Sequence, residues 1–326
     1  MAVGFEGSAG SLIPRIKSIS LFINNMCNLR CPYCYVSALN KEVPVEIKVD
    51  DIIKFINVVH EKCELESVVI VGREPLLSPK VMLEVLQEIQ KMGIPKVGII
   101  TNGTLITKKI AKKLAGLVSF VDVSFDGLKE AHEKTRGRGS FAKTVAGTKR
   151  LLDAGIDVFV LHKVDSASAP QLNEFAEFMW NMGVKNIHIF TLYPRDIKAD
   201  VFMDAIKELV DSPPSEMLIS IKGDYFDKEI LSALSDYICN EKMVESVEGI
   251  SFIEKSIKHN SILRVMLENE PAEFRRGLRI DCFGRLVFCA DQARSLKRPV
   301  GNISESLEEI FSRTSLIHKI IDDYVI

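Results

Sequence analysis

The 326-residue sequence lacks the features of several protein classes. No apolar run approaches the 18 or so residues that a membrane-spanning helix requires. Residues 1–11 contain no basic stretch before an apolar core, so they do not resemble a secretory signal. Neither sign of charge is in excess, because 42 Lys and Arg face 44 Asp and Glu, giving a net charge of -2. We therefore predict a cytoplasmic protein, with neither nucleic acid nor a membrane as partner.

Cysteine is also scarce, but its placement is informative. The seven cysteines are an odd number, which fits a disulfide framework poorly in a chain without a secretory segment. Three of them, Cys27, Cys31 and Cys34, lie in one short segment, residues 27–34, called the cysteine loop below. Thiolates hold iron-sulfur clusters, and a four-iron cluster normally takes four of them. Three local thiolates therefore predict a [4Fe-4S] cluster with one iron left open to another ligand.

A zinc site is the main alternative for this loop. Structural zinc needs a fourth ligand at a recognisable spacing, and the nearest candidates, His60 and Cys63, lie about thirty residues away. The sequence therefore favours the cluster.

From residue 19 onward, short β-branched runs alternate with segments in which apolar residues recur at helical spacing, as in βα units around a parallel sheet. We predict an α/β fold: a partial (β/α)6 TIM-like barrel with a smaller α+β C-terminal extension. The predicted strands are Ile19 to Ile23, Ser67 to Val71, Lys96 to Thr101, Phe120 to Phe125, Ile156 to His162 and Asn186 to Thr191.

Polar motifs follow the first four of these strands, at the point where each strand ends. The carboxyl ends of parallel strands meet at one edge of a sheet, so we expect the four motifs to lie together. They are the cysteine loop, Gly72-Arg73-Glu74-Pro75, Thr101-Asn102-Gly103 and Ser124-Phe125-Asp126-Gly127.

The cysteine spacing, with Tyr33 just before the last cysteine, resembles the signature of the radical S-adenosylmethionine (radical SAM) enzymes. In that family the amino and carboxylate groups of S-adenosylmethionine chelate the open iron. One electron from the cluster then cleaves the cofactor to methionine and a 5'-deoxyadenosyl radical. The resemblance implies both cofactors and an external one-electron donor such as flavodoxin or ferredoxin.

The resemblance also implies which residues hold the cofactor. Gly72-Arg73-Glu74-Pro75 is similar to the family's Gly-Gly-Glu-Pro string, which receives the amino group of S-adenosylmethionine, so Gly72, Glu74 and Pro75 are expected contacts. Arg73 departs from the string, and it would strain the turn if the position required a glycine-only backbone angle. Further contacts implied by the resemblance are Tyr33 near the adenine, Thr101 and Asn102 in the same wall, Ser124 and Asp126 at the ribose or methionine end, and Arg136 toward a carboxylate.

The C-terminal third has a different pattern of predicted elements. We expect the βα alternation to end at Pro194, with helices over Val201 to Val210 and Lys228 to Cys239 and a β-hairpin turning at Gly284. The predicted division is an N-terminal segment (residues 1–17), the barrel (18–195) and an extension covering the barrel mouth (196–326).

This extension resembles the SPASM/twitch extensions of radical SAM enzymes, in which Gly-x4-Cys on a hairpin helps to hold an auxiliary cluster. Gly284 and Cys289 match that string, but few further cysteines remain. We favour a degenerate extension without a second iron-sulfur cluster over one that holds it. Cys282 and Cys289 are also candidate donors of a hydrogen atom to a substrate radical, as in an epimerase; burial as small apolar side chains is the alternative.

The resemblance to sulfatase-maturing and peptide-modifying members favours a peptide or protein as substrate, in a reaction of maturase or epimerase type. A small molecule such as an aminoglycoside or sugar intermediate is the second candidate. A noncatalytic iron-sulfur scaffold or redox sensor is the third.

Overall fold

The structure, a computed structural model, describes residues 16–34, 43–63, 65–191, 197–222, 228–238, 242–245, 251–266, 277–288, 299 and 301–310. The strands are β1 (Ser18–Phe22), β2 (Ser67–Val71), β3 (Lys96–Thr101), β4 (Phe120–Phe125), β5 (Asp157–Lys163), β6 (Asn186–Phe190), β7 (Leu218–Lys222), β8 (Lys242–Glu245), β9 (Ser251–Ser256), β10 (Ile262–Met266), β11 (Gly277–Ile280), β12 (Arg285–Phe288) and β13 (Gly301–Asn302). The α-helices are α1 (Val49–Lys62), α2 (Pro79–Lys91), α3 (Lys108–Leu114), α4 (Lys129–Arg136), α5 (Ser140–Asp153), α6 (Leu172–Met182), α7 (Ala199–Asp211) and α8 (Lys228–Ile238), and the short 3-10 helices are η2 (Pro75–Leu77), η3 (Ala169–Gln171) and η5 (Lys258–Asn260).

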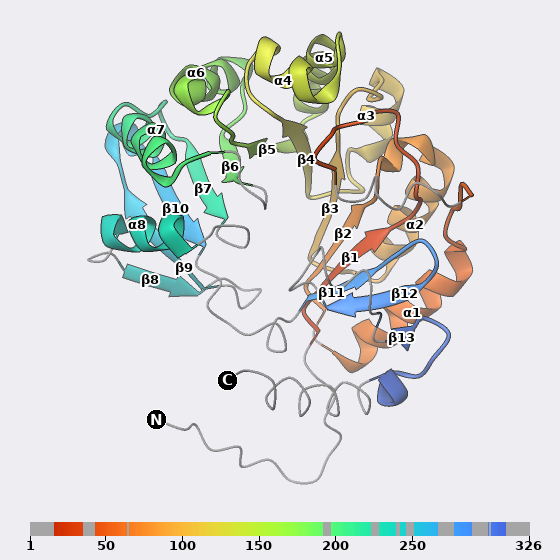
Figure 1. The fold of residues 1–326 in the computed structure, drawn as a ribbon. Helices are drawn as coiled ribbons and strands as arrows, with labels where there is room; N and C mark the ends of the chain where they lie inside the picture. Colours follow the sequence, from red (N-terminus) through yellow and green to blue (C-terminus); the bar gives the residue numbers. More distant parts are fainter. Residues whose placement is uncertain are drawn as a thin grey trace, which may run out of the picture.

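All of these strands belong to one sheet. Its order is β13-β12-β11-β1-β2-β3-β4-β5-β6-β7-β10-β9-β8, and β1 to β7 are parallel neighbours in sequence order. The sheet curves into an arc with the helices on its outer side (Figure 1). Its two ends, β13 and β8, do not pair, so the sheet is open. The predicted α/β class and partial barrel are confirmed.

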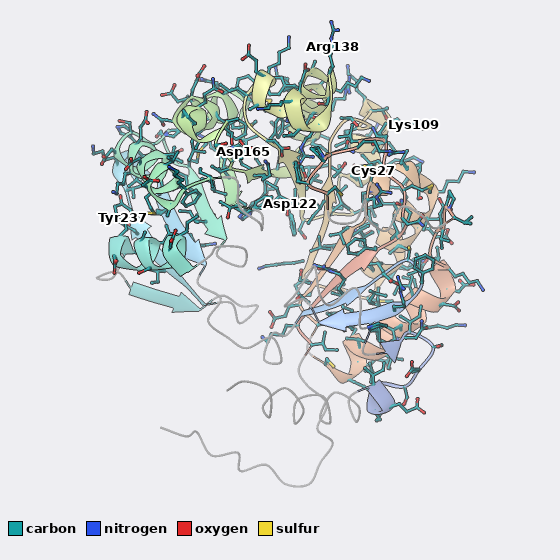
Figure 2. The ribbon with its side chains drawn as sticks, viewed as in Figure 1. Cys27, Lys109, Asp122, Arg138, Asp165 and Tyr237 are labelled. Atoms are coloured by element: carbon teal, nitrogen blue, oxygen red, sulfur yellow. The ribbon has the colours of Figure 1, made fainter. Side chains whose placement is uncertain are left out.

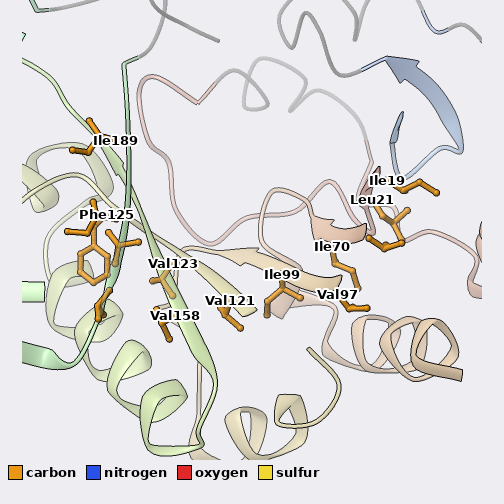
Figure 3. Close-up of a cluster of buried hydrophobic side chains, with 14 of the residues drawn as sticks. Ile19, Leu21, Ile70, Val97, Ile99, Val121, Val123, Phe125, Val158 and Ile189 are labelled. Carbon is orange, nitrogen blue, oxygen red and sulfur yellow. The ribbon is translucent and has the colours of Figure 1, made fainter. Parts of the chain in front are cut away.

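The six predicted strands are β1 to β6, with ends shifted by no more than a residue. Alternation along each strand divides the sheet into two faces. On the outer face Leu21, Ile70, Ile99 and Val123 are fully buried against the helices (Figure 3). The inner face of the same strands carries polar residues such as Ser20, Asp122 and Ser124 beside apolar ones, so the outer face supplies most of the packing and the inner face is left for a site.

Glycines follow the ends of three of the helices. Gly93, Gly155 and Gly183 follow α2, α5 and α6 with φ of 74°, 74° and 101°, a backbone angle that glycine adopts without a steric penalty.

The expected end of the alternation at Pro194 is wrong. Helix α7 is followed by β7, which pairs in parallel with β6, and β10 pairs in parallel with β7. Strand β7 was missed because its five residues, which include Ser220 and Lys222, form a pattern too short to identify a strand. The sheet thus continues past residue 195, and the division of the chain at that residue stays a prediction. The two predicted helices are α7 and α8; Cys239 lies outside the described residues.

The hairpin predicted near Gly284 is present. Strands β11 and β12 are antiparallel, and Gly284 turns between them with φ of 75°. Strand β11 also pairs in parallel with β1, so the hairpin extends the sheet next to the strand that leads into the cysteine loop. None of the described helices is long and apolar enough to cross a bilayer.

Candidate active site

The four motifs lie together as predicted, because β1 to β4 are consecutive parallel strands whose carboxyl ends share one edge. Hydrogen bonds join each motif to another. Figure 2 labels Cys27 of the cysteine loop and Asp122 on β4.

The cysteines of the cysteine loop are free thiols and are each half-buried. The backbone N–H of Cys34 donates to the carbonyl of Cys31 at 3.1 Å, which tightens the loop. The Cys27 sulfur receives the Leu29 N–H at 3.4 Å and lies 3.9 Å from the Asn102 side-chain nitrogen. Donors aimed at a sulfur are a means by which a protein stabilises a thiolate ligand.

Burial raises the pKa of the Cys27 and Cys31 thiols. At Cys27 the Glu74 carboxylate adds to this rise in pKa and Arg73 opposes it; at Cys31 Arg136 opposes the rise and Asp126 adds to it. The loop is therefore partly desolvated and lies between charges of both signs, and a bound metal would supply the preference for thiolate over thiol.

The thiols fit a multi-iron cluster better than a single ion. Within the described ranges, no three His, Cys, Asp or Glu side chains are close enough to hold one metal ion. The cysteine loop carries three thiols that are not joined in disulfides. The donor set, soft sulfur without imidazole or carboxylate, is the set that holds iron-sulfur clusters.

Glu74 occupies the turn after β2 and is completely buried. Its carboxylate accepts hydrogen bonds from the Leu76 N–H (3.0 Å), the Thr101 hydroxyl (2.8 Å) and the Asn102 N–H (2.8 Å). Burial raises the pKa of Glu74, while these three bonds oppose the rise. The carboxylate thus fastens the β2 turn to the end of β3. Pro75, also buried, begins η2; contact of either residue with a cofactor stays a prediction.

Arg73 is accommodated without backbone strain. The described non-glycine residues with positive φ are Glu216, His259 and Asn260, so Arg73 does not need a glycine-only angle. Its Nη1 donates to the Asn25 carbonyl at 3.2 Å.

Gly72 also has an ordinary φ, and a Cβ there would lie 3.6 Å from the Asn24 carbonyl oxygen.

Asp126, just beyond β4, is the centre of a buried polar cluster. Its carboxylate pairs with Arg136 at 2.9 Å and accepts hydrogen bonds from the Tyr33 hydroxyl (2.5 Å) and the Thr135 hydroxyl (2.6 Å). Its backbone N–H donates to Nδ1 of His132 at 3.3 Å. Burial opposes ionisation, but the Arg136 charge and these bonds lower the pKa of Asp126 to about 2. Tyr33 and Arg136, predicted as cofactor contacts, are therefore joined to Asp126.

The structure adds residues that the sequence did not identify. Lys163, at the end of β5, lies 4.8 Å from the centre of the Tyr33 ring and pairs with Asp165, labelled in Figure 2. A lysine at the end of a buried strand, at the same edge of the sheet as the four motifs, could have identified it from the sequence. Asn24, fully buried after β1, donates to the Ser78 hydroxyl at 2.9 Å and to the Glu74 carbonyl at 3.1 Å.

Asn102 connects β3 with the cysteine loop. Its amide donates to the Asn28 side chain at 2.9 Å, and its oxygen accepts from Thr104. Ser124 lies half-buried on the inner face of β4, and its expected contact stays a prediction.

The two candidate hydrogen donors are placed differently. Cys282 is buried in the turn that follows β11. It lines a cavity of about 540 Å³ with Glu46 and Asp51, beside α1 rather than on the inner face. Packing therefore explains Cys282; its role as hydrogen donor stays a prediction. Cys289 lies outside the described residues.

Comparison with known proteins supports the family. Residues 21–165 match the family model described as the radical SAM superfamily. The chain is similar to a probable GTP 3',8-cyclase of Saccharolobus islandicus (strain Y.N.15.51 / Yellowstone #2), with 26% identity over 182 residues, 55% of this chain and 58% of the relative. It is also similar to an uncharacterized protein, MJ0907, of Methanocaldococcus jannaschii, with 28% identity over 206 residues, 60% of this chain and 70% of the relative. The alignment with the cyclase thus spans less than two thirds of that protein's length.

Two solved structures share the fold over nearly the whole chain. Native anSMEcpe with bound AdoMet has a TM-score of 0.65 and 17% identity, over 90% of this chain and 80% of its own. Streptococcus suis SuiB bound to precursor peptide SuiA has a TM-score of 0.64 and 15% identity, over 92% of this chain and 65% of its own. Residues 21–165, which carry the loop of three cysteines and the shared edge of motifs, therefore match the radical SAM superfamily, whose enzymes use a [4Fe-4S] cluster and S-adenosylmethionine.

Proposed function

We propose that this radical SAM enzyme modifies a carbon of a peptide or protein, as a maturase or epimerase. The observation that carries the proposal is the hydrogen-bonded edge formed by the cysteine loop and the motifs after β2, β3 and β4. A peptide substrate is supported by the fold shared with anSMEcpe and with SuiB, both of which have been solved with bound peptides.

In this proposal Cys27, Cys31 and Cys34 hold the cluster, and the Gly72-Arg73-Glu74-Pro75 turn lies beside the site of S-adenosylmethionine. When bound, the two groups together supply a 5'-deoxyadenosyl radical that abstracts hydrogen from a substrate carbon. The residues of the chain position these groups. Glu74 fixes the turn against β3, and Asp126 fixes Tyr33 of the cysteine loop against β4. Preorganisation of this kind keeps reacting groups aligned without a cost at the moment of reaction.

The reducing equivalent would come from a protein such as flavodoxin or ferredoxin. The predicted degenerate extension without a second cluster is part of the proposal. Its support is that the described cysteines outside the loop, Cys63 and Cys282, are buried and follow different elements, α1 and β11.

The first experiment measures cofactor cleavage. Anaerobically reconstituted protein with dithionite and S-adenosylmethionine should release 5'-deoxyadenosine. The variant with Cys27, Cys31 and Cys34 all changed to Ala should release none. Cys63→Ala is the matched control, because it removes a free thiol outside the loop, and it should retain cleavage. No 5'-deoxyadenosine from the wild-type protein would favour a noncatalytic scaffold or redox sensor.

The second experiment tests the substrate class. A short peptide encoded beside this chain's gene should accelerate 5'-deoxyadenosine release and change mass or stereochemistry. An epimerase acting through a thiol would place solvent deuterium in the product, and that label should be lost in Cys282→Ala or Cys289→Ala. Acceleration by an aminoglycoside or sugar intermediate, but by no peptide, would favour the small-molecule alternative instead.

A further inference from the structure

Arg73 stands where the related string has glycine, and its side chain lies against the start of the cysteine loop. Its Nη1 donates to the carbonyl of Asn25, two residues before Cys27. The next peptide of the same turn is joined to the loop as well, because the Glu74 N–H donates to the Met26 carbonyl at 2.8 Å. The guanidinium is therefore held beside the first cluster ligand by the segment that leads into it.

No carboxylate in the described part of the chain forms an ion pair with Arg73, although the Glu74 charge acts on Cys27 in the opposite sense to that of Arg73. The adjacent Glu74 turns away, since its oxygens accept from Leu76, Thr101 and Asn102. The Nε atom of Arg73 is buried and has no hydrogen-bond partner among the described residues.

Arg136 offers a contrast at the other side of the loop. It acts electrostatically on Cys31, but its charge is paired with Asp126 at 2.9 Å. A third cation, Arg30, is bound to the Cys27 and Leu29 carbonyls at 2.6 and 2.9 Å, but it is exposed, so solvent and salt screen it. Arg73 is thus the cation near Cys27 that is both partly buried and free of a described carboxylate partner.

We propose that Arg73 raises the one-electron reduction potential of the cluster on the cysteine loop. The inference rests on the proposed function, which supplies the cluster. A cluster held by three thiolates carries net negative charge, and one-electron reduction adds to it without breaking a bond. A nearby cation stabilises the reduced form more than the oxidised form, and net charge and hydrogen bonding are among the factors that set the potential of these clusters.

The test is a redox titration of the reconstituted protein, without S-adenosylmethionine, followed by electron paramagnetic resonance of the reduced cluster. Dithionite supplies the electrons in this titration. Arg73→Met and Arg73→Gly should each shift the midpoint to a more negative potential. Arg73→Lys keeps the charge and should stay close to the wild-type midpoint. Iron and sulfide analysis must show equal loading in every variant that is compared.

Arg30→Met is the matched control, since it removes the same charge from an exposed position on the same loop. Its shift should be smaller and should disappear at high salt, whereas the Arg73→Met shift should persist. The inference is overturned by equal midpoints for wild type and Arg73→Met, by equal shifts for Arg30→Met and Arg73→Met, or by an Arg73→Lys protein that behaves like Arg73→Met. Failure of every Arg73 variant to take up a cluster would also overturn it, because it would show a structural role.

The two proposals fail in distinguishable ways. If the wild-type protein binds no cluster, the proposed function fails before the titration begins. If the wild-type cluster forms and cleaves S-adenosylmethionine, but its midpoint potential does not change when Arg73 is replaced, only the inference about Arg73 fails.

Discussion

Replacing Asp126 with Asn should destabilise the protein strongly, because it leaves the buried Arg136 cation without its ion-pair partner. The Asp126 carboxylate is completely buried, pairs with Arg136 at 2.9 Å and accepts hydrogen bonds from Tyr33 and Thr135. The asparagine amide has nearly the same shape, so the substitution changes charge and hydrogen bonding rather than packing.

Two effects contribute to the loss in free energy of unfolding. The shift of the Asp126 pKa from 3.8 to about 2 corresponds to about 2 kcal/mol of stability. This value counts only the preference for the ionised carboxylate. Removing one partner of a buried ion pair costs about 3–5 kcal/mol, because the other charge stays buried without compensation. The second effect should dominate, so we expect Asp126→Asn to lower the free energy of unfolding by about 3 kcal/mol or more.

Urea unfolding followed by the fluorescence of Trp180, the single tryptophan, and by circular dichroism would measure this loss. The double variant Asp126→Asn/Arg136→Met removes the stranded cation and should regain much of the stability. A loss below about 1 kcal/mol in the single variant, or a double variant no more stable than the single one, would refute the reasoning. The pH dependence has a definite sign: because the folded pKa of Asp126 is lowered, the stabilisation is present above about pH 4 and is lost as the pH falls toward 2.

Three further predictions follow from buried groups elsewhere. Burial lowers the pKa of His132 to about 3 and of His162 to about 4, so the unfolded chain binds more protons than the folded one. The free energy of unfolding, measured in urea, should therefore decrease as the pH is lowered from 7.5 to 4.5, by up to about 1.4 kcal/mol per pH unit for each histidine. A flat profile would contradict this. Gly147→Ala should lower the free energy of unfolding by about 2 kcal/mol or more, although alanine has the better helix propensity, because the new Cβ would lie 2.1 Å from the Gly103 carbonyl oxygen. An unchanged thermal midpoint would show that α5 can shift to make room. Arg279→Met should leave stability unchanged or raise it by about 1 kcal/mol, since Nε and Nη1 of Arg279 are buried without described hydrogen-bond partners and methionine can still pack on the Phe22 ring that the guanidinium covers. A clear loss in urea unfolding would reveal a structural role.

The sequence predicted those parts of the fold that are encoded locally. Strands β1 to β6 are short runs rich in β-branched residues, and segments of helical periodicity separate them, so their positions could be predicted to within a residue. The hairpin at Gly284 was equally local, because one glycine and two alternating runs specify it. Pairing partners are not local. Nothing in β11 indicates that it lies beside β1, more than 250 residues earlier, and the short β7 was hidden by its length.

The candidate site shows the same division. The cysteine spacing and the motifs at strand ends identified the correct edge, since residue order alone places them at the carboxyl ends of neighbouring parallel strands. The partners of Asp126 could not be predicted, because Tyr33 approaches it from 93 positions away through the path of the loop. The environment of Arg73 could not be predicted from the sequence either. Its place in the motif suggested backbone strain, but its φ is negative, so there is none.

The contacts along this edge explain why a loop of three cysteines can be held ready for a cluster. At its start, the loop is fastened to the β2 turn, through the Glu74 N–H and the Met26 carbonyl. Near its end, it is fastened to β4 through Tyr33 and Asp126. Each anchor is itself fixed by a buried charge or hydrogen-bond network, so the positions of the thiols depend on residues that do not bind metal. A substitution in β4 should therefore disturb the cysteine loop as directly as one within it, because the loop has no helix or strand of its own to preserve its shape.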